Sequence, residues 1–86
     1  MFLHIGNGQT VKKKNIIGIF DLDSVSLSSA GRDFLSREQK KGNVTYYDTD
    51  LPRSFLLLEG GEIKLSRIST QGLKTRVNAP IGDLEE

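Results

Sequence analysis

Residues 53–76 place the strongest constraint on the fold, because two β-prone runs flank the pair Gly60-Gly61. A glycine pair between such runs is a strong signal for a two-residue β-hairpin turn. In that register Leu58 faces Ile63 and Leu56 faces Leu65, so all four share one side of the ribbon. The opposite side then holds Phe55, Leu57, Lys64 and Ser66. We therefore expect a sheet with a core face and a second, mixed face that also needs a cover.

The cover over Phe55 and Leu57 has two alternatives, another subunit or the first helix of the same chain. A chain of 86 residues buries only about 60–65% of the surface that its unfolded form exposes. Association of several copies would therefore help to stabilise so thin a core. On this ground Phe55 and Leu57 are candidate residues of an oligomer interface.

The pattern along the chain predicts an α+β fold with a small, mainly antiparallel sheet, one main helix and a short C-terminal helix. Besides the hairpin, strands are expected at 2–5, 9–12, 15–22 and 44–47, with a Gly-Asn-Gly turn at 6–8. The run at 15–22 is almost continuously apolar, which is typical of a central strand covered on both faces. Pro52 ends pairing before the hairpin because proline lacks a backbone donor.

The main helix is expected to begin after Ser26 or Ser28 as N-cap and to end before Gly42. Its apolar stripe would consist of Leu27, Ala30, Phe34 and Leu35. A second helix is expected at 71–77, capped by Ser69 or Thr70. Residues 1–77 would form one domain, and residues 78–86 an acidic and mobile tail.

Composition excludes several function classes. The chain has no cysteine and only one histidine, His4, so thiol chemistry and a zinc cluster are excluded. A serine hydrolase would need His4 as its base, but a strand residue is the commoner role for it. We expect no enzyme activity, no cofactor, no small-molecule ligand, no membrane span and a cytoplasmic location.

Charge permits an anionic partner. The formal net charge is +1, with 12 basic and 11 acidic residues, and three of the acids lie in the tail. Lys12, Lys13 and Lys14 are the best candidates for phosphate contacts, which would make affinity sensitive to salt. The alternative is that these lysines protect an edge strand from aggregation. A second basic set is expected to form structural pairs: Arg53, Lys64, Arg67, Lys74 and Arg76.

Two aromatic residues, Tyr46 and Tyr47, have two interpretations as well. Their rings could stack on nucleobases. The commoner alternative is a strand that turns one ring inward.

The segments Ile5-Gly6-Asn7-Gly8, Val11 and 15–21, followed by 63–66, Thr70, 73–74 and Arg76, resemble the RemA/RemB family of bacterial extracellular-matrix (biofilm) regulators. The similarity covers residues 1–77 and is greatest to the RemB branch. It implies a small α+β subunit, a ring-like homo-oligomer and DNA binding that activates matrix genes.

In the RemA branch, arginines contact DNA after the Gly-x-Gly hairpin and in the loop before the second hairpin. The matching positions here are Asn15, Asp50 and Leu51, none of which is basic. Arg53 keeps a cation in the second loop, and Lys13 and Lys14 adjoin Asn15. The leading hypothesis is therefore a homo-oligomeric regulator that binds duplex DNA through Lys12, Lys13, Lys14 and Arg53. The alternative is a protein-interaction or scaffolding module that has lost DNA contact.

Overall fold

A computed structural model describes residues 1–78, so the predicted acidic tail at 78–86 lies, apart from Asn78, outside the described residues. Its elements are β1 (Phe2–Gly6), β2 (Gln9–Lys12), the 3-10 turn η1 (Lys13–Asn15), β3 (Ile16–Asp21), α1 (Leu22–Ser26), α2 (Ser29–Lys40), β4 (Val44–Thr45), β5 (Ser54–Leu58), β6 (Ile63–Ser66) and α3 (Thr70–Val77). The predicted α+β class, with a main helix and a short C-terminal helix, is confirmed.

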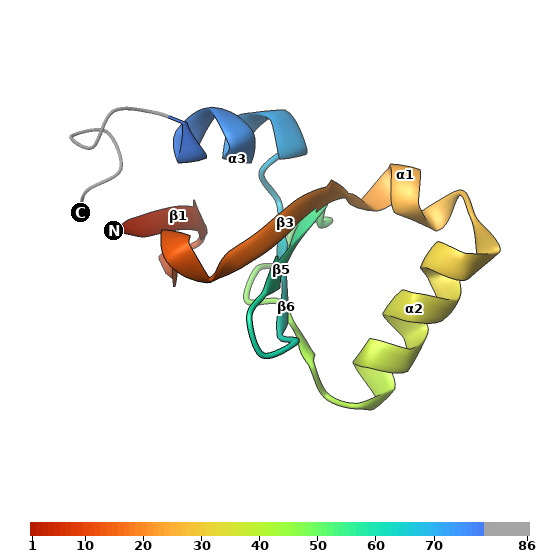
Figure 1. Ribbon diagram of the computed structural model, residues 1–86. Helices are drawn as coiled ribbons and strands as arrows, with labels where there is room; N and C mark the ends of the chain where they lie inside the picture. The colour runs from red at the N-terminus through yellow and green to blue at the C-terminus, as the bar shows by residue number, and fades with distance from the viewer. Residues whose placement is uncertain (79–86) are drawn as a thin grey trace.

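The strands form two sheets (Figure 1). β1 and β2 make an antiparallel hairpin whose turn holds Gly6, Asn7 and Gly8 at positive φ. The other sheet has the order β3-β5-β6-β4, in which only the β4–β6 pair is parallel. The sheet is therefore mainly antiparallel, as predicted.

The predicted register of the β5–β6 hairpin is wrong by one residue. Leu57 pairs with Ile63 and Phe55 pairs with Leu65. The Leu58 amide donates to Glu62 O at 2.9 Å, so the loop is Glu59-Gly60-Gly61 rather than the glycine pair alone. Both glycines have φ near +92°, which suits a longer hairpin loop as well as a two-residue turn. Relative to β5, this one-residue shift places every β6 side chain on the face opposite to the predicted one.

One face of the four-stranded sheet packs on the β1–β2 hairpin and α3 and forms the core. Leu56 and Leu58 of β5 join Leu3, Ile5, Val11 and Leu73 in a single buried cluster. Two buried serines fix this layer: Ser66 Oγ donates to Ile5 O at 2.7 Å, and Ser54 Oγ donates to Ile68 O at 2.6 Å. Since the core lies on this side, the opposite face needs a separate cover.

That opposite face contains Phe55, Leu57, Ile63 and Leu65, and the chain covers it only in part. The Phe20 ring stacks on Phe55 with 5.0 Å between ring centroids. A Cβ on Gly18 would lie 2.6 Å from the Phe20 ring, so the glycine lets that ring fold back over its own strand. Phe55 is thereby reduced to 3% exposure within the single chain, whereas Leu57 is half-buried.

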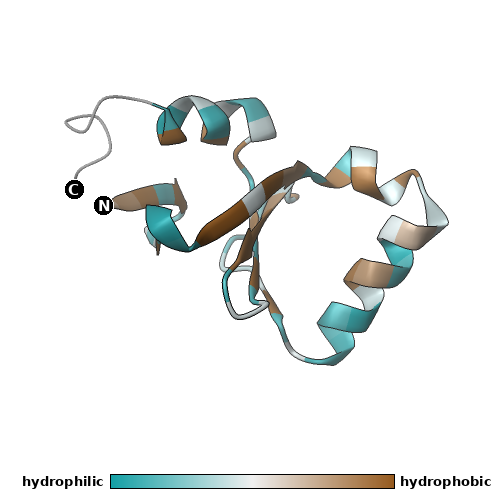
Figure 2. Ribbon diagram, in the orientation of Figure 1, coloured by the Kyte–Doolittle hydropathy of each residue, from teal (hydrophilic) through white to brown (hydrophobic). Residues whose placement is uncertain are grey.

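The predicted central position of the 15–22 strand is wrong, because β3 lies at the edge of the sheet. Its apolar run is only partly covered: Ile17 is 61% exposed and Phe20 is 39% exposed. Figure 2 shows most of this strand in the colour of hydrophobic residues. Continuous hydrophobicity indicates burial on two faces, but it does not say whether the second cover belongs to the same chain.

The ends of α2 were predicted correctly, but its buried stripe was not. Ser28 Oγ accepts from the Gly31 amide at 3.0 Å, and Gly42 follows the helix at φ +80°. No residue of α2 is buried, and Leu27 of the predicted stripe is 84% exposed. The helix packs against α1 and β4 and stands away from the sheet (Figure 1), which lengthens the molecule to 39 × 24 × 22 Å.

Helix α1 was not predicted, whereas α3 was. Asp21 caps α1 by accepting from the Ser24 amide at 2.8 Å. Ser69 caps α3 by accepting from the Gly72 amide at 3.0 Å, which selects Ser69 rather than Thr70 as N-cap. Within residues 1–78, none of the helices has the length and apolar character needed to cross a membrane.

Candidate nucleic-acid interface

The three predicted lysines lie together where the β1–β2 hairpin joins the edge strand. Lys12 ends β2, and Lys13 and Lys14 begin the η1 turn. The Lys13 amide donates to Met1 O at 3.0 Å, which fixes the turn beside the start of β1. Lys12 and Lys14 are exposed and Lys13 is half-buried. Among the described residues none of the three side chains enters a salt bridge, so their charge is available to an anion.

Arg53 lies at the other end of the sheet from the lysines. It precedes β5, and Ser54 at the start of β5 pairs with Asp21 at the end of β3. β3 has six residues, which separate its ends by roughly 20 Å at about 3.3 Å per residue. One subunit therefore presents the three lysines and Arg53 as two separate patches.

The loop before β5 carries a pair of carboxylates, Asp48 and Asp50, and Asp50 stands where the family resemblance implied an arginine. Arg67 Nε lies 3.1 Å from Asp48 Oδ2, and Arg67 Nη1 lies 3.1 Å from Asp50 Oδ2. Asp48 Oδ1 also accepts from the Thr49 amide at 2.7 Å. This loop is thus acidic and internally paired, so it does not supply a phosphate contact at Asp50.

The two tyrosines have different environments beside that loop. The Tyr46 hydroxyl donates to Asp50 O. Burial, followed by the nearby Asp48 and Asp50 carboxylates, raises the pKa of the Tyr46 phenol above its ordinary value. Tyr47 is 55% exposed, and Lys64 Nζ lies 5.6 Å from its ring centroid. The expectation that one ring turns inward therefore fits Tyr46.

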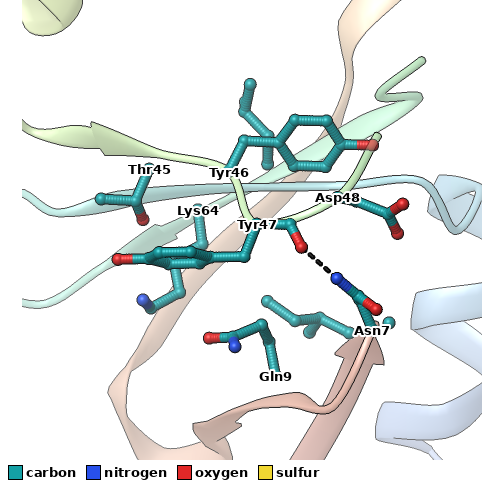
Figure 3. Close-up of a pocket in the computed structure, with 10 residues that line it drawn as sticks. Asn7, Gln9, Thr45, Tyr46, Tyr47, Asp48 and Lys64 are labelled. Carbon is teal, nitrogen blue, oxygen red and sulfur yellow. Dashed lines mark hydrogen bonds between the residues drawn. The ribbon is translucent and has the colours of Figure 1, made fainter. Parts of the chain in front are cut away.

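A cleft between these tyrosines and the β1–β2 turn is shown in Figure 3. The Asn7 side-chain amide donates to Tyr47 O across it. Its volume of about 10 Å³ is enough for no more than one water molecule. The buried Thr45 hydroxyl that lines it has no partner among the described residues. Across residues 1–78 no three His, Asp or Glu side chains gather as a metal site.

The remaining basic residues are partly paired, as predicted. Lys64 Nζ lies 3.1 Å from Glu62 Oε2, and Arg67 binds two carboxylates. Arg76 Nη1 instead donates to the His4 carbonyl at 3.1 Å, which ties α3 to β1. Lys74 is exposed on α3.

One surface residue beside the lysines was not selected from the sequence. Phe2 is the direct cross-strand partner of Lys12 and is 43% exposed. The available signal was alternation, since Leu3 and Ile5 point inward and Phe2 must then point outward.

A comparison with protein-family models matches residues 2–77 to the RemA-like family, described as extracellular matrix regulatory protein A-like. The chain belongs to this family of extracellular matrix regulators. A comparison with curated proteins found no match.

Proposed function

We propose that the protein is a non-enzymatic, DNA-associated regulator of extracellular-matrix (biofilm) genes that acts in the cytoplasm as a homo-oligomer, with RemB as its nearest branch. Membership of the RemA-like family supports the matrix role. The observation that carries DNA association is the cluster of exposed Lys12 and Lys14 with half-buried Lys13, without salt bridges to described residues. Repetition of this weak patch around an assembly would give the avidity that one subunit lacks.

Two apolar surfaces support self-association. The first is a cavity of about 210 Å³ between α2 and the sheet, lined by Leu22, Leu35, Gln39, Val44, Pro52 and Leu65. The second is the edge strand β3 with exposed Ile17. A hydrophobic edge strand is a template for pairing with another chain. Because the two surfaces differ, their contact would be heterologous, and such contacts form rings when the rotation closes. Phe20 covers Phe55 within the chain, while half-buried Leu57 stays a candidate for the interface.

The decisive experiment measures binding to duplex DNA over a series of salt concentrations. Replacement of Lys13 and Lys14 by alanine should weaken binding and reduce the slope of log affinity against log salt by roughly 0.9 for each lost phosphate contact. Lys40→Ala, in an exposed lysine at the end of α2, is the matched control and should leave the slope unchanged. Absence of binding by the wild type at low salt would contradict the proposal.

A protein-interaction module without DNA contact is the second candidate. The pairing of Asp50 with Arg67 and the 87% exposure of Leu51 favour it, because both occupy positions where the family resemblance implied arginine. The same titration separates the two functions. The protein-interaction function would be supported if the protein assembles but shows no DNA binding at low salt. Its Leu51→Ser variant should then lose a specific protein partner.

A further inference from the structure

The outer face of the β1–β2 hairpin holds an aromatic residue that the fold does not cover. Side chains of this hairpin alternate between its two faces, and Leu3, Ile5 and Val11 enter the core. Phe2 and Lys12 pair across the strands on the opposite, outer face. Facing residues in an antiparallel pair have Cβ atoms about 5 Å apart. The strand pairing therefore places the half-exposed Phe2 ring beside the Lys12 side chain.

A groove runs beside this pair and brings in a second lysine. Met1, Phe2, Lys12 and Lys14 line it, and its volume is about 280 Å³. Lys14 lines the same groove as Lys12, and the amide of Lys13 between them donates to Met1 O at 3.0 Å. We call this site the Phe2 groove. It combines an apolar wall of Phe2 and Met1 with two ammonium groups.

These features select a ligand that is both flat and anionic. An aromatic wall stacks on a planar ring, and two lysines at its edge attract phosphate oxygens. The volume lies just below the roughly 300 Å³ at which pockets for drug-sized ligands begin, so it suits one nucleobase better than a larger group. A base inside an intact duplex shows no face to a side chain, so the base must be unpaired.

We propose that the Phe2 groove holds one unpaired nucleobase against the Phe2 ring, with the adjoining phosphates on Lys12 and Lys14, an assignment that rests on the proposed DNA association. The protein should then prefer DNA that contains unpaired nucleotides to a fully paired duplex of the same sequence. Phosphate contact supplies affinity, whereas stacking on Phe2 supplies the preference.

The test compares the binding of three DNA probes at one salt concentration: a single strand, its duplex, and that duplex with a central unpaired bubble. The wild type should bind the bubble and the single strand more tightly than the duplex. Phe2→Leu keeps an apolar side chain but removes the ring, and should weaken binding to the two unpaired probes by roughly 5- to 150-fold. Its affinity for the duplex and its salt slope should not change, and Phe2→Trp should retain the preference.

Controls separate this site from the proposed function and from other occupants. Tyr47→Leu removes an exposed ring outside the groove and should leave the preference unchanged. Binding to the duplex without preference for unpaired DNA overturns the inference and leaves the proposed function standing, while binding to none of the probes overturns both. The inference is also overturned if Phe2→Leu abolishes binding to anionic phospholipid vesicles but not to DNA, or if it changes the sedimentation of the protein and weakens all probes equally.

Discussion

At the scale of single residues, polar side chains hold the loop that precedes β5. Arg67 holds Asp48 and Asp50, and the Tyr46 hydroxyl donates to Asp50 O. Local rules narrowed each cap to two residues that included Ser28 and Ser69, because a cap needs only an amide three residues away. Arg67, which directly follows β6, pairs with Asp50 in a loop 17 residues earlier. No local pattern contains that information, so only the general expectation of pairing could be drawn from the sequence.

The Tyr46 phenol predicts how stability depends on alkaline pH. Its pKa is raised in the folded state, so the folded state favours the neutral phenol. Stability from this group is present below the ordinary pKa near 10 and is lost as the pH rises through the higher folded value. Tyr46→Phe should flatten the loss of stability in urea unfolding measured between pH 9 and 11, whereas the control Tyr47→Phe should not. An unchanged pH profile in Tyr46→Phe would show that the phenol does not titrate against folding.

At the scale of elements, one glycine sets the junction between α1 and α2. A Cβ on Gly31 would lie 2.0 Å from the Val25 carbonyl oxygen and 2.7 Å from its Cγ1. Glycine to alanine inside a helix normally stabilises by up to about 1 kcal/mol. Gly31→Ala should instead destabilise by about 1–3 kcal/mol, as overpacking does. Urea unfolding measures the change, with Ser36→Ala at an exposed position of α2 as control, and a stabilised Gly31→Ala variant would contradict the close contact.

The elements also show where sequence reasoning succeeded and where it stopped. Alternation predicted the bounds of β2, and capping predicted the position of α3; both are local properties of the sequence. The β5–β6 register failed because Gly60 and Gly61 suit a two-residue and a three-residue loop equally well. The position of β3 failed because its apolar run does not reveal whether its second cover comes from another chain. The candidate site was predicted at Lys12–Lys14. The outward position of Phe2 follows from alternation alone, whereas the separation of Arg53 from the lysines required the tertiary fold.

At the scale of the whole molecule, the cavity beside α2 and the exposed edge of β3 predict a heterologous assembly that mixing can test. Leu35→Glu should block the cavity, and Ile17→Lys should block the edge, so each variant alone should be monomeric in sedimentation velocity while the wild type assembles. Mixed in equal amounts, the two variants should form a dimer and nothing larger, because one intact edge meets one intact cavity. Ser36→Glu, on the exposed side of α2, should assemble like the wild type. A mixture that stays monomeric, or an Ile17→Lys variant that still assembles fully, would show that the two surfaces do not meet.

Because phosphate affinity is multiplied by the number of linked patches, each monomeric variant should also lose most of its DNA binding with all of its lysines in place.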